Sequence, residues 1–278
     1  MTIPKAIKPL GISDKYIHFL LVAGPGFGKT VLFGTEDKCL FLTTDPEGTV
    51  SAWALGSNAK EWEIKQWDDI VAAYAYLRDG GIAELGITWV VIDNVSEAQE
   101  LAKNQNILLE RKRNDKIDEF VPSQGNYQRT QNQLLDLVKK FHDLPVNVGW
   151  TAWIATHEDN EGIEYFAPAI HGQKGAIAQM IAGYMNVVGY GEVIEDDEGA
   201  EHRRIWFSQT GPHRGKDRFV ALGKSRTDMS LPKMQLIINA AIKKRQAERS
   251  AAGTTTTKAQ TTVRTVRRTT STATRKKA

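Results

Sequence analysis

The segment from Tyr16 to Gly34, YIHFLLVAGPGFGKTVLFG, constrains the fold more than any other part of the sequence. Its apolar residues 17–23 predict a buried strand, which leads into a turn with three glycines, Gly24, Gly26 and Gly28. Glycine lets the backbone curl so that successive N–H groups point at one anion. The start of a following helix adds unpaired N–H groups and the positive end of its dipole. The segment therefore predicts a strand, a phosphate-binding loop and a helix, in that order.

The loop fits the P-loop pattern G-x-x-x-x-G-K-[ST] at every fixed position except the first, where Ala23 replaces glycine. Lys29 supplies a mobile charge for the outer phosphates, and Thr30 supplies a hydroxyl for the Mg²⁺ ion that accompanies the nucleotide. The alternative is a glycine-rich turn that binds nothing. We expect a nucleotide to be held by Gly24, Pro25, Gly26, Phe27, Gly28, Lys29, Thr30 and Val31.

The composition limits the class of protein. With 278 residues and 41% hydrophobic residues, the chain can bury one sizeable core. Its single cysteine, Cys39, stands in an apolar strand pattern and excludes a disulfide framework and a cysteine zinc site. The six histidines show no metal-ligand spacing, and no apolar run approaches ~18 residues. We therefore expect a cytoplasmic protein with no membrane partner and no metal other than the Mg²⁺ brought by a nucleotide.

The charge is divided unevenly along the chain. Residues 243–278 hold 11 of the 36 Lys and Arg residues and one of the 33 acids, Glu248, so this segment carries +10 and the rest carries −7. From Ser250 the sequence is too poor in apolar side chains to offset the entropy of ordering. We expect a core over 1–242 and a basic, Thr-rich, disordered tail over 243–278. Such a tail suits a polyanionic partner, although a solubilising tail would have the same composition.

Strand and helix patterns alternate along the first part of the chain. Apolar or alternating runs predict strands at 39–44, 61–67, 88–93 and 148–156, and helices at 68–78, from Ser96 onwards and at 127–142. The last third differs, because MNVVGYGEVIE, RRIWFSQ and DRFVAL predict antiparallel strands, followed by a helix over 231–249. We therefore expect an α/β fold in which helices flank a mostly parallel sheet, with antiparallel C-terminal strands and the disordered tail.

Acidic residues follow two of the predicted strands, at the end where the P-loop lies. Asp93 ends TWVVID; beside a P-loop, an acid there is expected to hold the Mg²⁺ ion together with Thr30, unless it only caps the next helix. The segment LFLTTDPEGTV resembles the second strand of RecA-like recombinases. This resemblance implies that Glu47 polarises the attacking water, with Asp45 as the preceding acid. The alternative is a turn glutamate held by solvent.

Two further positions extend the resemblance. His157 directly follows the predicted strand at 148–156. It resembles the polar residue that senses the γ-phosphate in RecA-like ATPases, although a lone histidine is more often structural. Arg218 resembles an arginine finger that reaches the nucleotide of a neighbouring subunit, with Arg214 and Lys216 as alternatives. The other interpretation is a surface hairpin that carries charged residues.

Residues 15–225 together resemble the RecA-like ATPases of bacteriophages, a group of AAA-type ATP-binding, single-strand annealing and recombination proteins. The resemblance implies a RecA-like P-loop NTPase core, ATP and Mg²⁺ as cofactors, and a Mg²⁺-dependent ATPase activity in the cytoplasm of the host cell. It also implies a homo-oligomer with ATP between subunits, and action on single-stranded DNA in recombination, annealing or replication, alongside phage or host replication and recombination proteins. Two loops would face the DNA: residues 111–116, and 158–175 with Tyr165 and Phe166 as base-stacking groups.

Two other functions share the same nucleotide residues. One is a motor or loader that acts on a protein partner at a replication fork. The other is a non-hydrolysing, ATP-dependent DNA-binding module. A kinase is disfavoured, because the segment Asp45-Pro46-Glu47-Gly48-Thr49 favours activation of water.

Overall fold

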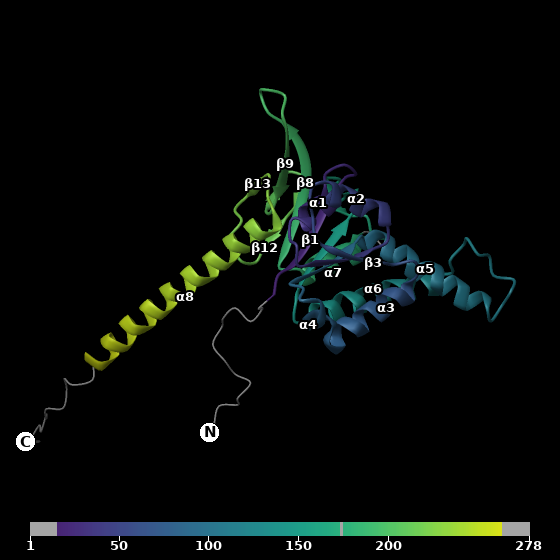
Figure 1. Ribbon diagram of the computed structural model, residues 1–278, viewed down its shortest axis with the longest axis horizontal. Helices are drawn as coiled ribbons and strands as arrows, with labels where there is room; N and C mark the ends of the chain where they lie inside the picture. Colours follow the sequence, from purple (N-terminus) through teal and green to yellow (C-terminus); the bar gives the residue numbers. More distant parts are fainter. Residues whose placement is uncertain (1–15, 173–174, 263–278) are drawn as a thin grey trace, which may run out of the picture.

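The computed structural model describes residues 16–172 and 175–262 of the chain. Within them, a nine-stranded sheet has the order β13-β9-β8-β1-β5-β4-β2-β3, with β12 paired to β8. Figure 1 shows this sheet among the helices, with the last helix running out from the body. The strands are β1 (His18–Ala23), β2 (Cys39–Thr43), β3 (Lys60–Glu63), β4 (Trp89–Asp93), β5 (Asn147–Ala152), β8 (Val187–Glu195), β9 (Glu201–Trp206), β12 (Lys216–Asp217) and β13 (Ser225–Thr227).

The pairing of the strands is parallel in the centre and antiparallel at one side. The neighbours β8–β1, β1–β5, β5–β4, β4–β2 and β2–β3 are all parallel. Strands β9 and β12 run antiparallel to β8, and β13 runs antiparallel to β9. The mostly parallel α/β sheet with added antiparallel strands is therefore confirmed.

Helices cover both faces of the sheet. Helices α1 (Lys29–Gly34) and α8 (Leu231–Thr262) pack on one face, and α3 (Trp67–Tyr76), α5 (Val95–Arg111), α6 (Gln124–His142) and α7 (Ala176–Tyr184) pack on the other. Shorter helical segments are η1 (Pro46–Thr49), α2 (Val50–Ala54), η2 (Leu77–Gly81) and α4 (Ile82–Leu85). In β1, Leu20 and Val22 join the core on the α5 side, whereas Phe19 and Leu21 join the core on the α1 side. Burial on both faces explains why these strands are continuous apolar runs in the sequence.

One predicted strand is divided in the structure. The prediction of a single strand over 148–156 is wrong, because β5 ends at Ala152 and the chain then forms β6 (Ile154–Glu158). Strand β6 pairs with β7 (Glu164–Pro168) in a separate two-stranded sheet. The neighbours of β5 end at the same level, since Ala152 pairs with Val22 and Trp150 pairs with Ile92. Beyond Ala152 a longer strand would therefore have no partner in the main sheet, so β6 pairs with a partner of its own.

Helix starts differ from the predicted ones by a few residues. Helix α5 begins at Val95 and is capped by Asn94, whose side chain accepts a hydrogen bond from the N–H of Glu97, so Ser96 is not the cap. Helix α6 begins at Gln124 after the cap Ser123, rather than near Tyr127. Both caps are short polar side chains of the kind that satisfies the free N–H groups of a first turn.

The segment DRFVAL does not form the predicted strand beyond its first residue. Strand β12 ends at Asp217, and the Asp217 carboxylate then accepts hydrogen bonds from the N–H groups of Phe219, Ala221 and Leu222. These bonds wind the chain into a compact turn in which Val220 has a φ of 49°. The other small sheet pairs β10 (Gln209–Thr210) with β11 (His213–Arg214) around the predicted turn at Gly211.

Helix α8 continues to Thr262, well past its predicted end at Arg249. The boundary expected at 242/243 therefore falls inside this helix. The rest of the tail that was expected to be disordered, residues 263–278, lies outside the described residues. Among the helices of the described part, none combines the length and apolar character needed to cross a bilayer.

Candidate nucleotide-binding site

The P-loop joins the end of β1 to the start of α1, as the sequence predicts. Gly26 and Gly28 have φ angles of 76° and 88°, in the left-handed region that favours glycine. A Cβ atom added to Gly24 or Gly26 would meet no atom within 4 Å, so the side of the loop away from the core is open. A cavity of about 670 Å³ lies at the loop. Its lining consists of Gly26, Gly28, Lys29, Thr30, Val31, Ser51, Leu55 and Arg203.

Two side chains of the loop point into the core instead. Ala23 is fully buried among the residues beneath α1, so the methyl that replaces the usual glycine does not enter the loop. Phe27 is 3% exposed, and its ring packs so closely on Gly191 of β8 that a Cβ there would lie 2.5 Å from it. Phe27 can therefore offer a nucleotide only its backbone, and its ring fixes the tip of the loop to the sheet.

Lys29 lies across the loop. Its ammonium group donates hydrogen bonds to the carbonyl oxygens of Ala23 and Gly24, each 3.0 Å away. Partial burial lowers the pKa of Lys29, and the nearby charge of Asp93 opposes that shift. The amine is thus held where phosphate oxygens could replace the two carbonyl groups as its partners.

Asp93 is the meeting point of three elements. Its Oδ2 atom accepts a hydrogen bond of 2.6 Å from the hydroxyl of Thr30 on α1, and its Oδ1 atom accepts one of 2.5 Å from the hydroxyl of Thr151 on β5. A hydroxyl and a carboxylate side by side at a phosphate-binding loop are the oxygen donors that Mg²⁺ prefers. The donor set therefore fits the ion expected at Thr30 and Asp93. Thr151 was not named by the sequence analysis, although a polar residue in the apolar run VGWTAW is the signal for it.

Glu47 and Asp45 follow β2, the strand next to β4. Thr43 at the end of β2 is in register with Asp93, so η1 begins beside the Asp93 carboxylate. The carbonyl oxygen of Asp45 accepts hydrogen bonds from the Thr43 hydroxyl and the Gly48 N–H, and Glu47 is exposed. This placement agrees with the expected strand-end position of Glu47; its catalytic role stays a prediction.

A further carboxylate of this region is Glu97, in the first turn of α5. Burial raises its pKa, with smaller upward contributions from Glu100 and Asp45, while Lys103 opposes the shift. Sequence reasoning missed Glu97, because acids are common in the first turns of helices and nothing in its local pattern distinguishes it.

His157 does not lie at the end of a strand of the main sheet. It belongs to β6, and its ring stacks on Tyr165 with 5.8 Å between ring centroids. The position next to Asp93 at the end of β5 belongs to Thr151 and Ala152 instead, so the expected strand-end placement of His157 is wrong. Among the contacts of the described residues, His157 has none with Asp93 or the P-loop. Its role as a γ-phosphate sensor stays a prediction.

None of the contacts described for the three cations considered for the arginine finger involves the P-loop. Lys216 donates hydrogen bonds to the carbonyl oxygens of Ala182 and Gly183 at the end of α7, and Arg218 also donates to Gly183 at 2.7 Å. Burial, with repulsion from Arg218, lowers the pKa of Lys216 to about 8. Both side chains thus satisfy carbonyl groups at a helix C-terminus within their own subunit.

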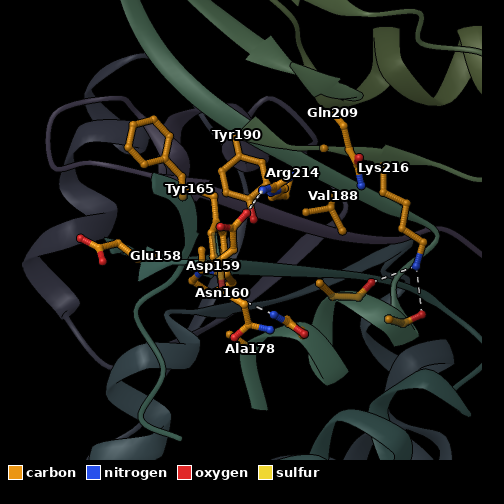
Figure 2. A pocket seen from close by; sticks show the side chains of 17 residues that line it. Glu158, Asp159, Asn160, Tyr165, Ala178, Val188, Tyr190, Gln209, Arg214 and Lys216 are labelled. Carbon is orange, nitrogen blue, oxygen red and sulfur yellow. Dashed lines mark hydrogen bonds and ion pairs between the residues drawn. The ribbon is translucent and has the colours of Figure 1, made fainter. Parts of the chain in front are cut away.

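Arg214 and Lys216 line a second cavity, of about 680 Å³, between α7, β7 and β8. Figure 2 shows Arg214 next to Tyr165 and Tyr190, with the side chain of Lys216 extending away from them. The Arg214 guanidinium lies over the ring of Tyr165 at 5.1 Å and 3.7 Å from the Asp159 carboxylate. Tyr165 is 8% exposed and already contacts the side chains of His157, Arg214 and Gln179, so it offers little surface for base stacking.

Residues 15–219 match the model of a family described as AAA domain. Among curated protein sequences, none matches the chain. The family match begins just before β1, contains the P-loop and Asp93, and ends just after Arg218. Since it spans most of the sequence and encloses the site described above, the chain belongs to the AAA-domain family of P-loop ATPases.

Proposed function

We propose that the protein is a RecA-like, Mg²⁺-dependent ATPase that acts on single-stranded DNA, in recombination, annealing or replication of the kind served by the phage proteins it resembles. The observation that carries the ATPase part is the convergence of Thr30 and Asp93 beneath the P-loop. The strand order supports the RecA-like part, because β5 lies between the P-loop strand β1 and the Asp93 strand β4. That order leaves Asp93 next to β2, from which Glu47 follows.

Each polar group of the site has a role in this proposal. Lys29 and the N–H groups of the loop bind and orient the phosphates, while Thr30 and Asp93 hold the metal ion, which supplies positive charge for the phosphate oxygens. Glu47 orients the attacking water and accepts its proton. Arg218 would add charge from a neighbouring subunit, so the proposal includes a homo-oligomer.

Charge on two segments supports nucleic acid as the partner. Figure 1 shows the connection between α5 and α6 projecting from the body, and its residues 111–116 include four cations. Its acids reduce that charge, since Arg111 is paired with Glu119. The stronger argument is the +10 carried by residues 243–278, because a cationic segment binds polyanions by releasing their counterions.

A protein partner is the second candidate, favoured by exposed apolar side chains on the same connection. Phe120 is 83% exposed and Val121 is 63% exposed, close in sequence to exposed leucines at the end of α5. Exposed apolar groups in one segment are typical of interaction sites. A motor or loader of the same fold would use them to hold another protein rather than DNA.

The deciding measurement is ATP turnover by the purified protein with and without an oligodeoxythymidylate. We expect Mg²⁺-dependent turnover that single-stranded DNA stimulates, loss of turnover in Lys29→Ala, and normal turnover in the control Lys140→Ala, which changes a lysine on α6. An ATP turnover rate that is the same with and without single-stranded DNA would favour the protein partner. ATP binding without any turnover would favour the non-hydrolysing module.

Removal of residues 250–278 tests the tail separately. The deletion removes seven cations, at 258, 264, 267, 268, 275, 276 and 277. If about half of them meet phosphates, the slope of log affinity against log salt for single-stranded DNA should shrink by roughly 2 to 3 units, at ~0.7 per contact. Equal slopes for the two proteins would assign DNA binding to the core.

A further inference from the structure

Arg203 of β9 lies above the P-loop because of the register of three strands. Ala23, the last residue of β1, pairs with Gly191 of β8, and Val193, two residues further along β8, pairs with Arg203. The β8–β9 hairpin therefore continues past the end of β1, which Figure 1 shows as an arm extending beyond the sheet. Arg203 stands on this arm, at the level of the loop that follows β1.

The alternation of β9 then sets the face to which Arg203 belongs. Ile205 and Phe207, two and four residues further on, are buried in the core beneath α1. Arg203 shares their face of the sheet, which is the face that carries the P-loop helix. Arg204 lies on the opposite face, where its guanidinium sits over the ring of Trp206 at 5.5 Å and 3.8 Å from the Glu192 carboxylate.

The contacts of Arg203 hold its guanidinium at the loop. Its Nε atom donates a hydrogen bond of 3.0 Å to the carbonyl oxygen of Phe27 and lies 3.4 Å from the position of a Cβ on Gly28. Its backbone is fixed as well, because its N–H donates to the Asp228 carboxylate and its carbonyl oxygen accepts from the Asp228 N–H. Arg203 thus lines the same cavity as Lys29 and Thr30.

The guanidinium of Arg203 has no close ion-pair partner in the part of the chain that the structure describes, and its charge acts on Asp228 only at longer range. Among residues 16–172 and 175–262, no carboxylate lies within 4 Å of its side chain, and its two terminal nitrogens have no hydrogen-bond partner. With Nε fixed on Phe27, the planar guanidinium keeps both terminal nitrogens for an oxyanion. An oxyanion that entered this cavity beside the P-loop would lie within reach of these nitrogens, and a nucleotide would bring phosphate groups there.

We propose that Arg203 is a phosphate-binding residue of the nucleotide site, supplied by the same subunit as the P-loop. The inference rests on the nucleotide binding proposed above and adds to it a second fixed cation, besides Lys29, on the far side of the loop. The proposal also connects the β8–β9 arm to the nucleotide, because Arg203 stands on this arm and binds the phosphate. This role differs from that of Arg218, whose expected target belongs to a neighbouring subunit.

The test is isothermal titration of the full chain with Mg-ADP and, separately, with inorganic tripolyphosphate. Arg203→Gln should weaken both by about tenfold or more, the scale of a charged hydrogen bond to phosphate. Arg204→Gln, the neighbouring arginine on the other face, is the control and should bind both within about twofold of the wild type. Arg203→Lys should recover part of the loss, because it keeps the charge but not the fork.

Three results would overturn the proposal. Arg203→Gln could bind both ligands as the wild type does, which would remove Arg203 from the site. The loss could occur with Mg-ADP and not with tripolyphosphate, which would assign Arg203 to the nucleoside. A loss that Arg203→Lys does not relieve, together with a lowered melting temperature, would mean that the bond to Phe27 only shapes the loop. Failure of the nucleotide site itself looks different, because wild type and Lys29→Ala would then bind neither ligand.

Discussion

The hydroxyl of Thr151 donates a hydrogen bond of 2.5 Å to the Oδ1 atom of Asp93, while the Oδ2 atom of the same carboxylate is held by Thr30. Thr151 is fully buried on β5, the strand inserted between the P-loop strand and the Asp93 strand. The orientation of the predicted metal-binding carboxylate is thus set from two sides. Thr30 would itself bind the metal ion, whereas Thr151 can only position the carboxylate.

Thr151→Val should therefore weaken the apparent affinity for Mg²⁺ in the ATPase reaction. Valine keeps the shape of threonine but cannot donate to Asp93, and loss of such an outer partner typically costs about 10- to 100-fold in metal affinity or activity. The measurement is turnover as a function of Mg²⁺ concentration, with nucleotide binding measured without Mg²⁺ as the second readout. We expect the second readout to stay unchanged.

The matched control for Thr151→Val is Thr156→Val, at an exposed position of β6. It should leave the Mg²⁺ dependence as in the wild type. If Thr151→Val needs no more Mg²⁺ than the wild type, the hydroxyl does not position Asp93.

Glu47→Gln separates nucleotide binding from hydrolysis. Glutamine keeps the shape and hydrogen bonding of the side chain but cannot accept a proton, so ATP should still bind while kcat falls by about 10²-fold or more. Single-turnover hydrolysis and equilibrium ATP binding measure the two effects. Glu97→Gln is the comparison, because Glu97 is a carboxylate near Asp45, whose charge contributes to its raised pKa. If kcat falls in Glu97→Gln and not in Glu47→Gln, the general base is Glu97.

The sequence predicts the parts of this site that depend on local chemistry. Two short sequence patterns contain these parts. One is the run of glycines followed by a lysine and a threonine, and the other is the acid at the end of an apolar strand. The order of strands, by contrast, depends on which strands pair far apart in the sequence, and no local pattern contains it. This is why Thr151 and Arg203, which reach the site from β5 and β9, were not predicted.

The same distinction explains the misplaced histidine. The run VGWTAWIAT is largely apolar and predicts one strand, yet β5 has partners in the main sheet only as far as Ala152. A strand ends where its neighbours end, and that limit is a property of the sheet rather than of the segment. His157 consequently lies in the β6–β7 hairpin, five residues after the last residue of β5.

Arg218→Ala tests the arginine finger against a structural role. A finger acts on the nucleotide of a neighbour, so turnover should fall while ATP binding stays normal, and mixing with Lys29→Ala should restore part of the activity. Because Arg218 also donates to Gly183, its loss could instead loosen the end of α7. A lowered melting temperature without complementation would support that structural role. Arg226→Ala is the matched control, since Arg226 donates to the carbonyl oxygen of Leu222 in a similar way.

The β8–β9 arm contains a histidine clamped between two carboxylates. The Nδ1 atom of His202 is 2.6 Å from Asp228, and its Nε2 atom is 3.0 Å from Asp196. The hydrogen bond to Asp228, and then that to Asp196, raises the pKa of His202. The pKa of Asp196 is lowered, chiefly by its bond to His202, and that of Asp228 is lowered by its backbone bond to Arg203 and then by His202.

These shifts give a stability that depends on pH with a defined sign. A histidine whose pKa is raised on folding stabilises the protein fully below its unfolded pKa of about 6.5, and the contribution is lost as the pH rises through the raised value. Asp196 and Asp228 affect stability at acidic pH. Their stabilisation is present above their unfolded pKa and is lost only as the pH falls through their lowered folded pKa values. Around pH 6 both contributions are present, and above the folded pKa of His202 the histidine's contribution is gone.

His202→Gln should therefore lower the melting temperature more at pH 6 than at pH 8.5. Glutamine can still donate to one carboxylate but cannot carry the charge, so the difference from the wild type should shrink as the pH rises. The measurement is a series of thermal unfolding curves for both proteins between pH 5.5 and 8.5. His171→Gln is the comparison variant, because His171 is exposed and lies outside the arm, 3.4 Å from Glu100, and the same unfolding curves are recorded for it. A wild-type advantage over His202→Gln that is constant or grows with pH would show that the charged clamp does not stabilise the arm.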